Sequence, residues 1–398
     1  MKNPTKYFGN ELKHVKKVLN SENWSATSGS WNRTLEIEFA KKVGVKYAIA
    51  MNSGTATLHC ALKALGVGEG DEVITPALTV IMDTTSIFHA NAIPVYCDVN
   101  PNTLCLDPED LRKKITKKTK AIITVSLYGM PPDYDKIKEI ACGIPIIEDN
   151  AQSLFNTYEE RTIGNFGEFA SYSFENTKLL SCGEGGILVT NNENLAREAR
   201  KVAGHGFKNL HADEGRTRLN QDIFQDPNYK RHDKIGWNYR LSEVCAAVAM
   251  GQLEQCEKLQ QLRIDSASIF LDVMKKYNVF EYQETEDYCY THAYYTLGAK
   301  YVREKYGIPW QKFRSSYIKN GGDGIYGAWA VPYKEPVIQN KQYSSLLNSY
   351  KDLNLADSVC PVAEKIQPTI MQFKTNYRDL KLAKEKAKML ETTIKELF

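Results

Sequence analysis

Between residues 47 and 149, short and continuously apolar runs alternate with segments whose apolar residues recur at helical spacing. Runs such as 121–125 and 144–148 do not show the polar alternation of a strand with one face in water. They are typical of strands that are covered on both faces, and each run is bounded by a turn. This alternation predicts an α/β fold with a mostly parallel sheet that helices cover on both sides.

The pattern changes after about residue 195. Residues 205–235 are polar and have no clear period, so we expect a long loop or excursion, which in a compact enzyme usually has a function. Residues 241–275 predict one long amphipathic helix, and the remainder mixes short strands with a C-terminal helix. Because 398 residues exceed one ordinary core, we expect a large domain over residues 1–255 and a smaller α+β domain over 256–398.

The charge balance and the cysteines narrow the possible partners and the compartment. The net charge is +3, and Lys and Arg are interleaved with Asp and Glu, which does not favour nucleic acid or a membrane surface as a partner. No apolar run is long enough for a membrane span, and the N-terminus has no features of a signal peptide. Nine cysteines without CxxC spacing favour free thiols in a reducing compartment, so we expect a cytoplasmic protein without a metal site.

A small turn at residues 52–58 lies between a predicted strand and a predicted helix. The free backbone N–H groups of such a turn, together with the helix N-terminus, attract an anion. Ser53 and Thr55 add hydroxyl groups on either side of Gly54. A plain helix N-cap without a ligand accounts for the same residues, and this segment alone does not separate the two interpretations.

Asp149 follows the apolar run 144–148, at the C-terminal end of a predicted parallel strand. Ligands of α/β proteins bind at this end of the strands. There the carboxylate could pair with a protonated ring nitrogen and keep a pyridoxal-phosphate (PLP) cofactor electron-withdrawing. Taken alone, such an Asp is more commonly a helix cap.

Lys178 follows a predicted strand that ends near Phe174, and it precedes the Gly-rich turn 183–186. In a chain with 51 Lys and Arg residues, a single lysine is nearly always a solvated surface charge. This one is flanked by small and apolar residues, which could desolvate its amine for Schiff-base formation. A phosphate turn, a ring-nitrogen carboxylate and a lysine thus follow one another, each at the end of a predicted strand, and together they favour a PLP site.

The same segments resemble the DegT–StrS family of sugar aminotransferases, which have the type I aminotransferase fold. The resemblance covers about residues 5–260 and is weaker beyond them. No segment is specific alone, but the set is, and it comprises residues 53–56, 70–76, 119–123, 148–152, 173–178, 183–186 and 236–243.

The resemblance implies how the cofactor would be held. Lys178 would bind PLP as a Schiff base, and Asp149 would hold the pyridinium nitrogen. Gln152 would contact the ring hydroxyl. The phosphate would be bound by Gly54, Thr55 and Ser173, and by Asn238 of the neighbouring subunit. The family therefore implies a homodimer with shared active sites.

The chain departs from the family pattern in two places. Family members usually have an aromatic residue after Thr79, where it stacks on the cofactor ring, but this chain has Val80. Either the protein binds the cofactor ring more weakly because Val80 cannot stack on it, or an aromatic residue from elsewhere, such as Tyr128 or Trp237, covers the ring.

The excursion at 205–235 is longer than in many members and ends in basic residues. A solvated loop is the simpler interpretation of each of these residues. We nevertheless expect four residues to contribute to substrate binding: Tyr128, Lys230, Arg231 and His232.

The family implies that an amino group is transferred from glutamate or glutamine to a keto-sugar carried on a nucleotide. A dehydratase branch of the family has histidine in place of the lysine, and Lys178 argues against it. Two alternatives stay open: an aminotransferase acting on a non-nucleotide keto-sugar or a cyclitol, and a PLP-binding regulatory protein without turnover.

Overall fold

The computed structural model describes residues 3–289, 291–302 and 307–398, and its centre is a seven-stranded sheet. The strand order is β1-β9-β8-β5-β4-β2-β3. Only β9 runs antiparallel to its neighbours, so the predicted, mostly parallel sheet is confirmed. The strands are β1 (Tyr47–Met51), β2 (Glu72–Pro76), β3 (Ile93–Cys97), β4 (Thr119–Val125), β5 (Ile146–Asp149), β8 (Phe169–Ser173) and β9 (Gly186–Thr190).

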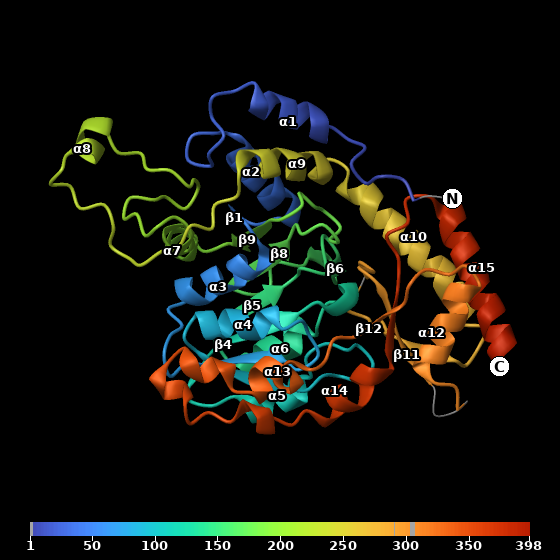
Figure 1. Cartoon of the computed structure of the whole chain (residues 1–398). Coiled ribbons are helices and arrows are strands. Elements are labelled where there is room, and N and C mark those ends of the chain that lie inside the picture. The colour runs from blue at the N-terminus through green and yellow to red at the C-terminus, as the bar shows by residue number, and fades with distance from the viewer. Residues whose placement is uncertain (1–2, 290, 303–306) are drawn as a thin grey trace.

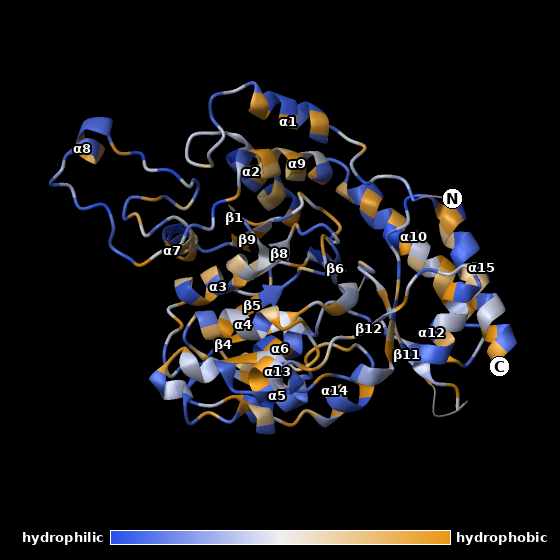
Figure 2. Cartoon of the chain, viewed as in Figure 1, coloured by the Kyte–Doolittle hydropathy of each residue, from blue (hydrophilic) through white to orange (hydrophobic). Residues whose placement is uncertain are grey.

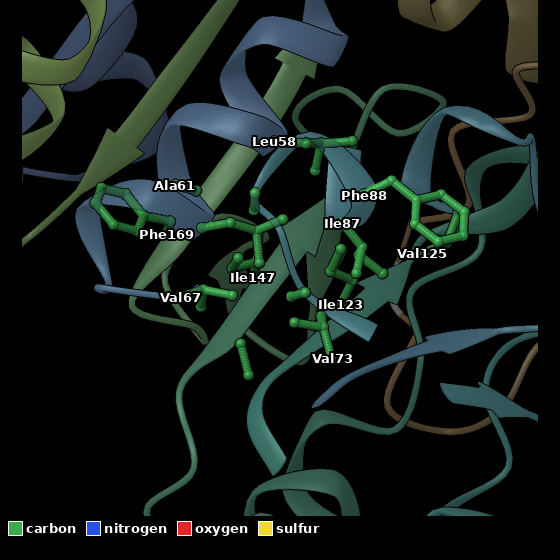
Figure 3. Packing of buried hydrophobic residues seen from close by; sticks show 14 of the residues in the cluster. Leu58, Ala61, Val67, Val73, Ile87, Phe88, Ile123, Val125, Ile147 and Phe169 are labelled. Atoms are coloured by element: carbon green, nitrogen blue, oxygen red, sulfur yellow. The ribbon is translucent and has the colours of Figure 1, made fainter. Parts of the chain in front are cut away.

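Helices cover both faces of this sheet, which explains the continuous apolar runs. Ile147 packs on one face with α3, α4 and α7, as Figure 3 shows for its surroundings. Its neighbour Ile146 packs on the other face, against α5 and α6, while α2 and α9 cover the β8–β9–β1 end of that face. These helices are α2 (Trp31–Val43), α3 (Gly54–Ala64), α4 (Met82–His89), α5 (Pro108–Lys114), α6 (Tyr134–Ala141), α7 (Glu193–Ala203) and α9 (Glu243–Leu253).

A second, antiparallel sheet has the order β10-β11-β13-β12. The elements of this part are β10 (Phe280–Tyr282), β11 (Leu297–Tyr301), β12 (Tyr326–Gly327), β13 (Ile370–Phe373), α10 (Cys256–Met274), α12 (Trp310–Lys319) and α15 (Leu380–Leu397). The apolar core of this sheet includes residues of the three helices. Figure 2 shows hydrophobic and hydrophilic residues alternating along α10 and α15.

The prediction of one long helix over 241–275 is wrong. The chain forms α9 and α10 instead, because the backbone of Gln255 leaves the helical region at φ −113° and ψ 3°. The break lets α9 cover the large sheet, while α10 packs along α15 (Figure 1). A further helix, α1 (Glu11–Leu19), packs on α9.

Residues 331–366 return to the large sheet. Tyr350 is buried there, and its hydroxyl donates to the Ala92 carbonyl at 2.8 Å. The Asp98 carboxylate accepts the N–H groups of Val362 and Ala363 at the start of α14. The division of the chain after residue 255 stays a prediction. The short elements here are η2 (Pro332–Lys334), α13 (Pro336–Gln339), η3 (Gln342–Ser345), η4 (Asn348–Tyr350), η5 (Leu355–Asp357), α14 (Pro361–Ile366) and η6 (Gln367–Thr369).

The predicted excursion over 205–235 is present, and Figure 1 shows it projecting from the body of the protein. Its only helix is α8 (Gln221–Gln225). Rings inside the excursion pack on one another, with Phe207 lying 4.5 Å from His232 and 5.9 Å from Phe224. Elsewhere, η1 (Leu127–Gly129) follows β4, and β6 (Thr157–Tyr158) pairs with β7 (Arg161–Thr162). In the described ranges, no helix is both long and apolar enough to cross a membrane.

Candidate active site

The three segments singled out in the sequence meet at one edge of the large sheet. Strands β1, β5 and β8 run in the same direction, so their C-terminal ends lie side by side. Residues 52–55 follow β1, residues 149–152 end and follow β5, and residues 173–178 end and follow β8. At this edge Gly186 pairs with both Met51 and Ser173. This is where α/β proteins bind their ligands.

An anion cradle forms where α3 begins. Ser53 caps the helix by accepting the Ala56 N–H at 3.0 Å. A Cβ atom on Gly54 would lie 2.9 Å from the Ser173 Cβ, so only glycine lets these two segments approach so closely. The approach places the Ser173 hydroxyl beside the N-terminus of α3, whose N–H groups and dipole favour a phosphate. Gly54, Thr55 and Ser173 are therefore brought together as the sequence predicts.

Asp149 is buried beside this cradle, with 4% of its surface exposed. Its Oδ1 accepts the Ala151 N–H at 2.9 Å. Burial raises the pKa of Asp149, whereas the Ala151 N–H, the positive charge of Lys178 and a hydrogen bond with Asp83 lower it. A buried carboxylate needs a cationic partner to offset its lost hydration. A protonated ring nitrogen of PLP would meet that need.

Lys178 lies in the turn after β8 and is half-buried. Its Nζ is 4.7 Å from the centre of the Tyr295 ring. The two residues line one cavity together with Gln152, Ser173 and Arg263. This cavity brings the predicted Schiff-base lysine next to two of the predicted cofactor contacts.

Arg263 was not anticipated from the sequence, where it looks like an ordinary charge on an amphipathic helix. It is buried, and its guanidinium donates to the carbonyls of Thr177 and Tyr295. Burial lowers the pKa of Arg263 to about 10; the negative charge of an ionised Tyr295 raises it, and the positive charge of Arg378 lowers it. Arg263 thus ties the Lys178 turn to the small domain.

Gln152 and Tyr128 are linked, since the Gln152 Oε1 accepts the Tyr128 N–H at 2.8 Å. Tyr128 is buried, has a positive φ of 59°, and lies with its ring against Gly298 of β11. A Cβ atom on Gly298 would come within 2.5 Å of that ring. Tyr128 therefore sits where the two sheets meet, and burial raises its pKa.

The remaining predicted residues are not among those that line the Lys178 cavity in the described part of the chain. Val80 is half-buried between β2 and α4. The Trp237 ring packs edge-on against the His59 ring, with 4.7 Å between ring centres, and is stacked with the Tyr239 ring. The side chain of Asn238 is exposed, while its backbone pairs with Gly204 and its carbonyl accepts the Asn52 side-chain amide.

Two of the basic residues of the excursion, Arg231 and His232, have local partners. The Arg231 guanidinium donates to the carbonyls of Phe224, Asp226 and Tyr229, which holds the turn around α8. His232 contacts the His205 carbonyl through its Nδ1 at 2.9 Å, and Lys230 is exposed. None of the three lines the Lys178 cavity within the described residues.

Comparison with known proteins agrees with this geometry. The model of the DegT/DnrJ/EryC1/StrS aminotransferase family matches residues 7–367. The chain belongs to this family. The type I aminotransferase fold is confirmed, as is PLP-dependent aminotransferase activity, and the residues described above fit the cofactor.

Three known proteins are similar to this chain. GDP-perosamine synthase of Escherichia coli O157:H7 is 35% identical over 66% of this chain and 68% of its own length. GDP-perosamine synthase of Caulobacter vibrioides is 38% identical over 63% of each chain. The crystal structure of an aminotransferase from Psychrobacter cryohalolentis is 27% identical, with a TM-score of 0.86 over 100% of this chain and 99% of that one.

Proposed function

We propose that this aminotransferase moves the amino group of glutamate or glutamine onto the keto carbon of a nucleotide-linked sugar. The observation that carries the proposal is the placement of Lys178 in one cavity with Ser173 and Gln152, beside the buried Asp149. The nucleotide-sugar class is supported by the two relatives named GDP-perosamine synthase.

The side chains divide the work of the reaction. Bound PLP would supply an electron sink that stabilises negative charge at the donor's Cα. Asp149 holds a proton on the ring nitrogen, which keeps that sink effective. The N-terminus of α3 and the Ser173 hydroxyl bind the phosphate. Lys178 Nζ would hold PLP as a Schiff base and, when free, would move a proton to and from the donor's Cα.

The assembly we propose is a homodimer in the cytoplasm. Asn238 is exposed in a single chain, and the excursion over 205–235 projects from the body of that chain (Figure 1). Both features would allow contacts with a second copy. In that dimer Asn238 would reach the partner's phosphate site, and Lys230, Arg231 and His232 could reach a substrate phosphate. All nine cysteines are free thiols, as suits a reducing compartment. Sedimentation that shows an active monomer would contradict the dimer.

A substrate panel tests the function. Purified protein is mixed with PLP, glutamate or glutamine, and each of several GDP-, UDP- and dTDP-linked keto-sugars, and amino-sugar formation is followed by mass spectrometry. We expect turnover with at least one nucleotide-linked keto-sugar. Turnover only with free keto-sugars or cyclitols would favour the first alternative. PLP binding without a half-reaction with any donor would favour the regulatory one.

A further inference from the structure

Asp83 is a carboxyl group that the reaction outlined above does not use, and it lies beside Asp149. It is in the first turn of α4, and its side chain is fully buried. Its carboxyl group lies close enough to that of Asp149 for each group to shift the pKa of the other. The two residues are 66 positions apart, but β2 and β5 end at the same edge of the sheet with only β4 between them.

The hydrogen bonds of Asp83 indicate where a proton resides. Thr79 Oγ1 donates to the Asp83 Oδ2. The other oxygen, Oδ1, is buried and accepts no N–H or O–H donor from the described residues. An ionised carboxylate would leave that oxygen unsatisfied in the interior, at a considerable cost. A neutral acid has one oxygen that accepts and one hydroxyl that donates, and the Asp149 carboxylate is in reach to accept.

We propose that Asp83 is a positioning residue, a neutral carboxylic acid that donates a hydrogen bond to Asp149 and holds that carboxylate toward the PLP ring nitrogen. The inference rests on the proposed role of Asp149. A hydrogen bond from a neutral acid to a carboxylate is charge-assisted and therefore stronger than one between neutral groups. Among the described residues, the other hydrogen-bond donor to Asp149 is the Ala151 N–H, which bonds to Oδ1.

The charges around the pair agree with this assignment. The groups that act on the pKa of Asp83 are Asp149 and Thr79. The positive charge of Lys178 acts in addition on the pKa of Asp149. Burial raises the pKa of Asp83 well above its ordinary value, the charge of Asp149 raises it further, and the Thr79 hydrogen bond lowers it. Burial raises the pKa of Asp149 as well, but the Ala151 N–H, Lys178 and Asp83 all lower it, whereas the pKa of Asp83 is lowered by the Thr79 hydrogen bond. The shared proton therefore stays on Asp83, and Asp149 is the ionised partner.

The first test needs no cofactor. Infrared spectra of PLP-free wild type and Asp83→Asn are compared near pH 7.5, and their difference isolates Asp83 from other buried acids such as Glu148. We expect a protonated-carboxyl C=O band that is present in the wild type and absent in the variant. A difference spectrum without that band would overturn the proposal, whatever the protein does with PLP.

Thermal unfolding of the same two PLP-free proteins gives a second readout. Asp83 carries a proton in the folded state above its ordinary pKa of 3.8, where the unfolded chain has lost it. Its contribution to stability is therefore complete below about pH 3.8 and is lost as the pH rises through the folded-state value. The Tm of Asp83→Asn minus that of the wild type should increase between pH 5 and pH 8. A flat difference would contradict a neutral Asp83.

Cofactor binding separates positioning from mere packing. Asp83→Asn keeps the size and a hydrogen-bond donor, whereas Asp83→Leu keeps the size and loses the donor. We expect the PLP Kd of Asp83→Asn to stay near that of the wild type, and the Kd of Asp83→Leu to rise at least about tenfold, as for one lost charge-assisted hydrogen bond.

With ¹⁵N-labelled PLP, the ring nitrogen should appear protonated in wild type and Asp83→Asn and less so in Asp83→Leu. Equal Kd values and equal ¹⁵N shifts in all three proteins would refute the positioning role. Absence of PLP binding in the wild type would instead refute the proposed function, and the infrared result would still report on the Asp83 proton.

Discussion

Gly186→Ala should displace the start of α3 and so disturb the anion cradle that it forms with Ser173. A Cβ atom at residue 186 would lie 2.7 Å from the backbone carbon and oxygen of Ser53 and 2.8 Å from the Gly54 nitrogen. These are backbone atoms of the turn that starts α3, so they cannot move aside as a flexible side chain would. The start of α3 must shift relative to β9, and with it the N–H groups that face the phosphate.

The magnitude follows from overpacking. Inserting a methyl group into such a closed contact costs about 1–3 kcal/mol. With an unfolding entropy of about 2.1 cal/mol/K per residue, that cost lowers the Tm of a chain of this length by roughly 1–4 °C. If the shift removes one hydrogen bond to the phosphate, the PLP Kd rises about ten- to a hundredfold.

The matched control is Gly68→Ala, because a Cβ atom there would have no atom within 4 Å and the residue does not have a positive φ. Differential scanning fluorimetry of the PLP-free proteins gives the Tm, and fluorescence titration with PLP gives the Kd. We expect Gly68→Ala to match the wild type in both. If Gly186→Ala also matches it, the close packing behind the cradle does not position the phosphate site, and the reasoning fails.

Three further outcomes follow from the site. Borohydride reduction should fix PLP on Lys178 and leave none attached to Lys178→Ala, and mass spectrometry that finds it on another lysine would refute the assignment. Asp149→Asn should keep its circular dichroism spectrum but lose turnover by orders of magnitude, so near-normal turnover would remove its role. Val80 cannot stack on the cofactor ring, and an aromatic stack would contribute about 0.5–1.5 kcal/mol. Val80→Phe should therefore slow the loss of aminated cofactor when the protein is dialysed after reaction with glutamate. Full retention of that cofactor by the wild type would show that another contact replaces the stack.

Much of the fold can be predicted from the sequence because it depends on local patterns. Apolar runs that end in turns locate strands such as β4 and β5 within about two residues. Gly54, Asp149 and Lys178 each follow or end a strand, and parallel strands end at one edge. Their meeting is therefore a consequence of sheet geometry as well as of family resemblance.

Other features depend on which segments pack together, and only the tertiary structure decides them. Asp83 looks like a residue of an ordinary helix start, and only the β2-β4-β5 order places it on Asp149. Arg263 looks solvated until its helix packs where the Lys178 turn and Tyr295 supply carbonyl acceptors. The break at Gln255 is also invisible in a helical pattern that continues across it. A pattern along the chain determines local conformation and which face is apolar, whereas burial and pairing of a charge depend on residues distant in sequence.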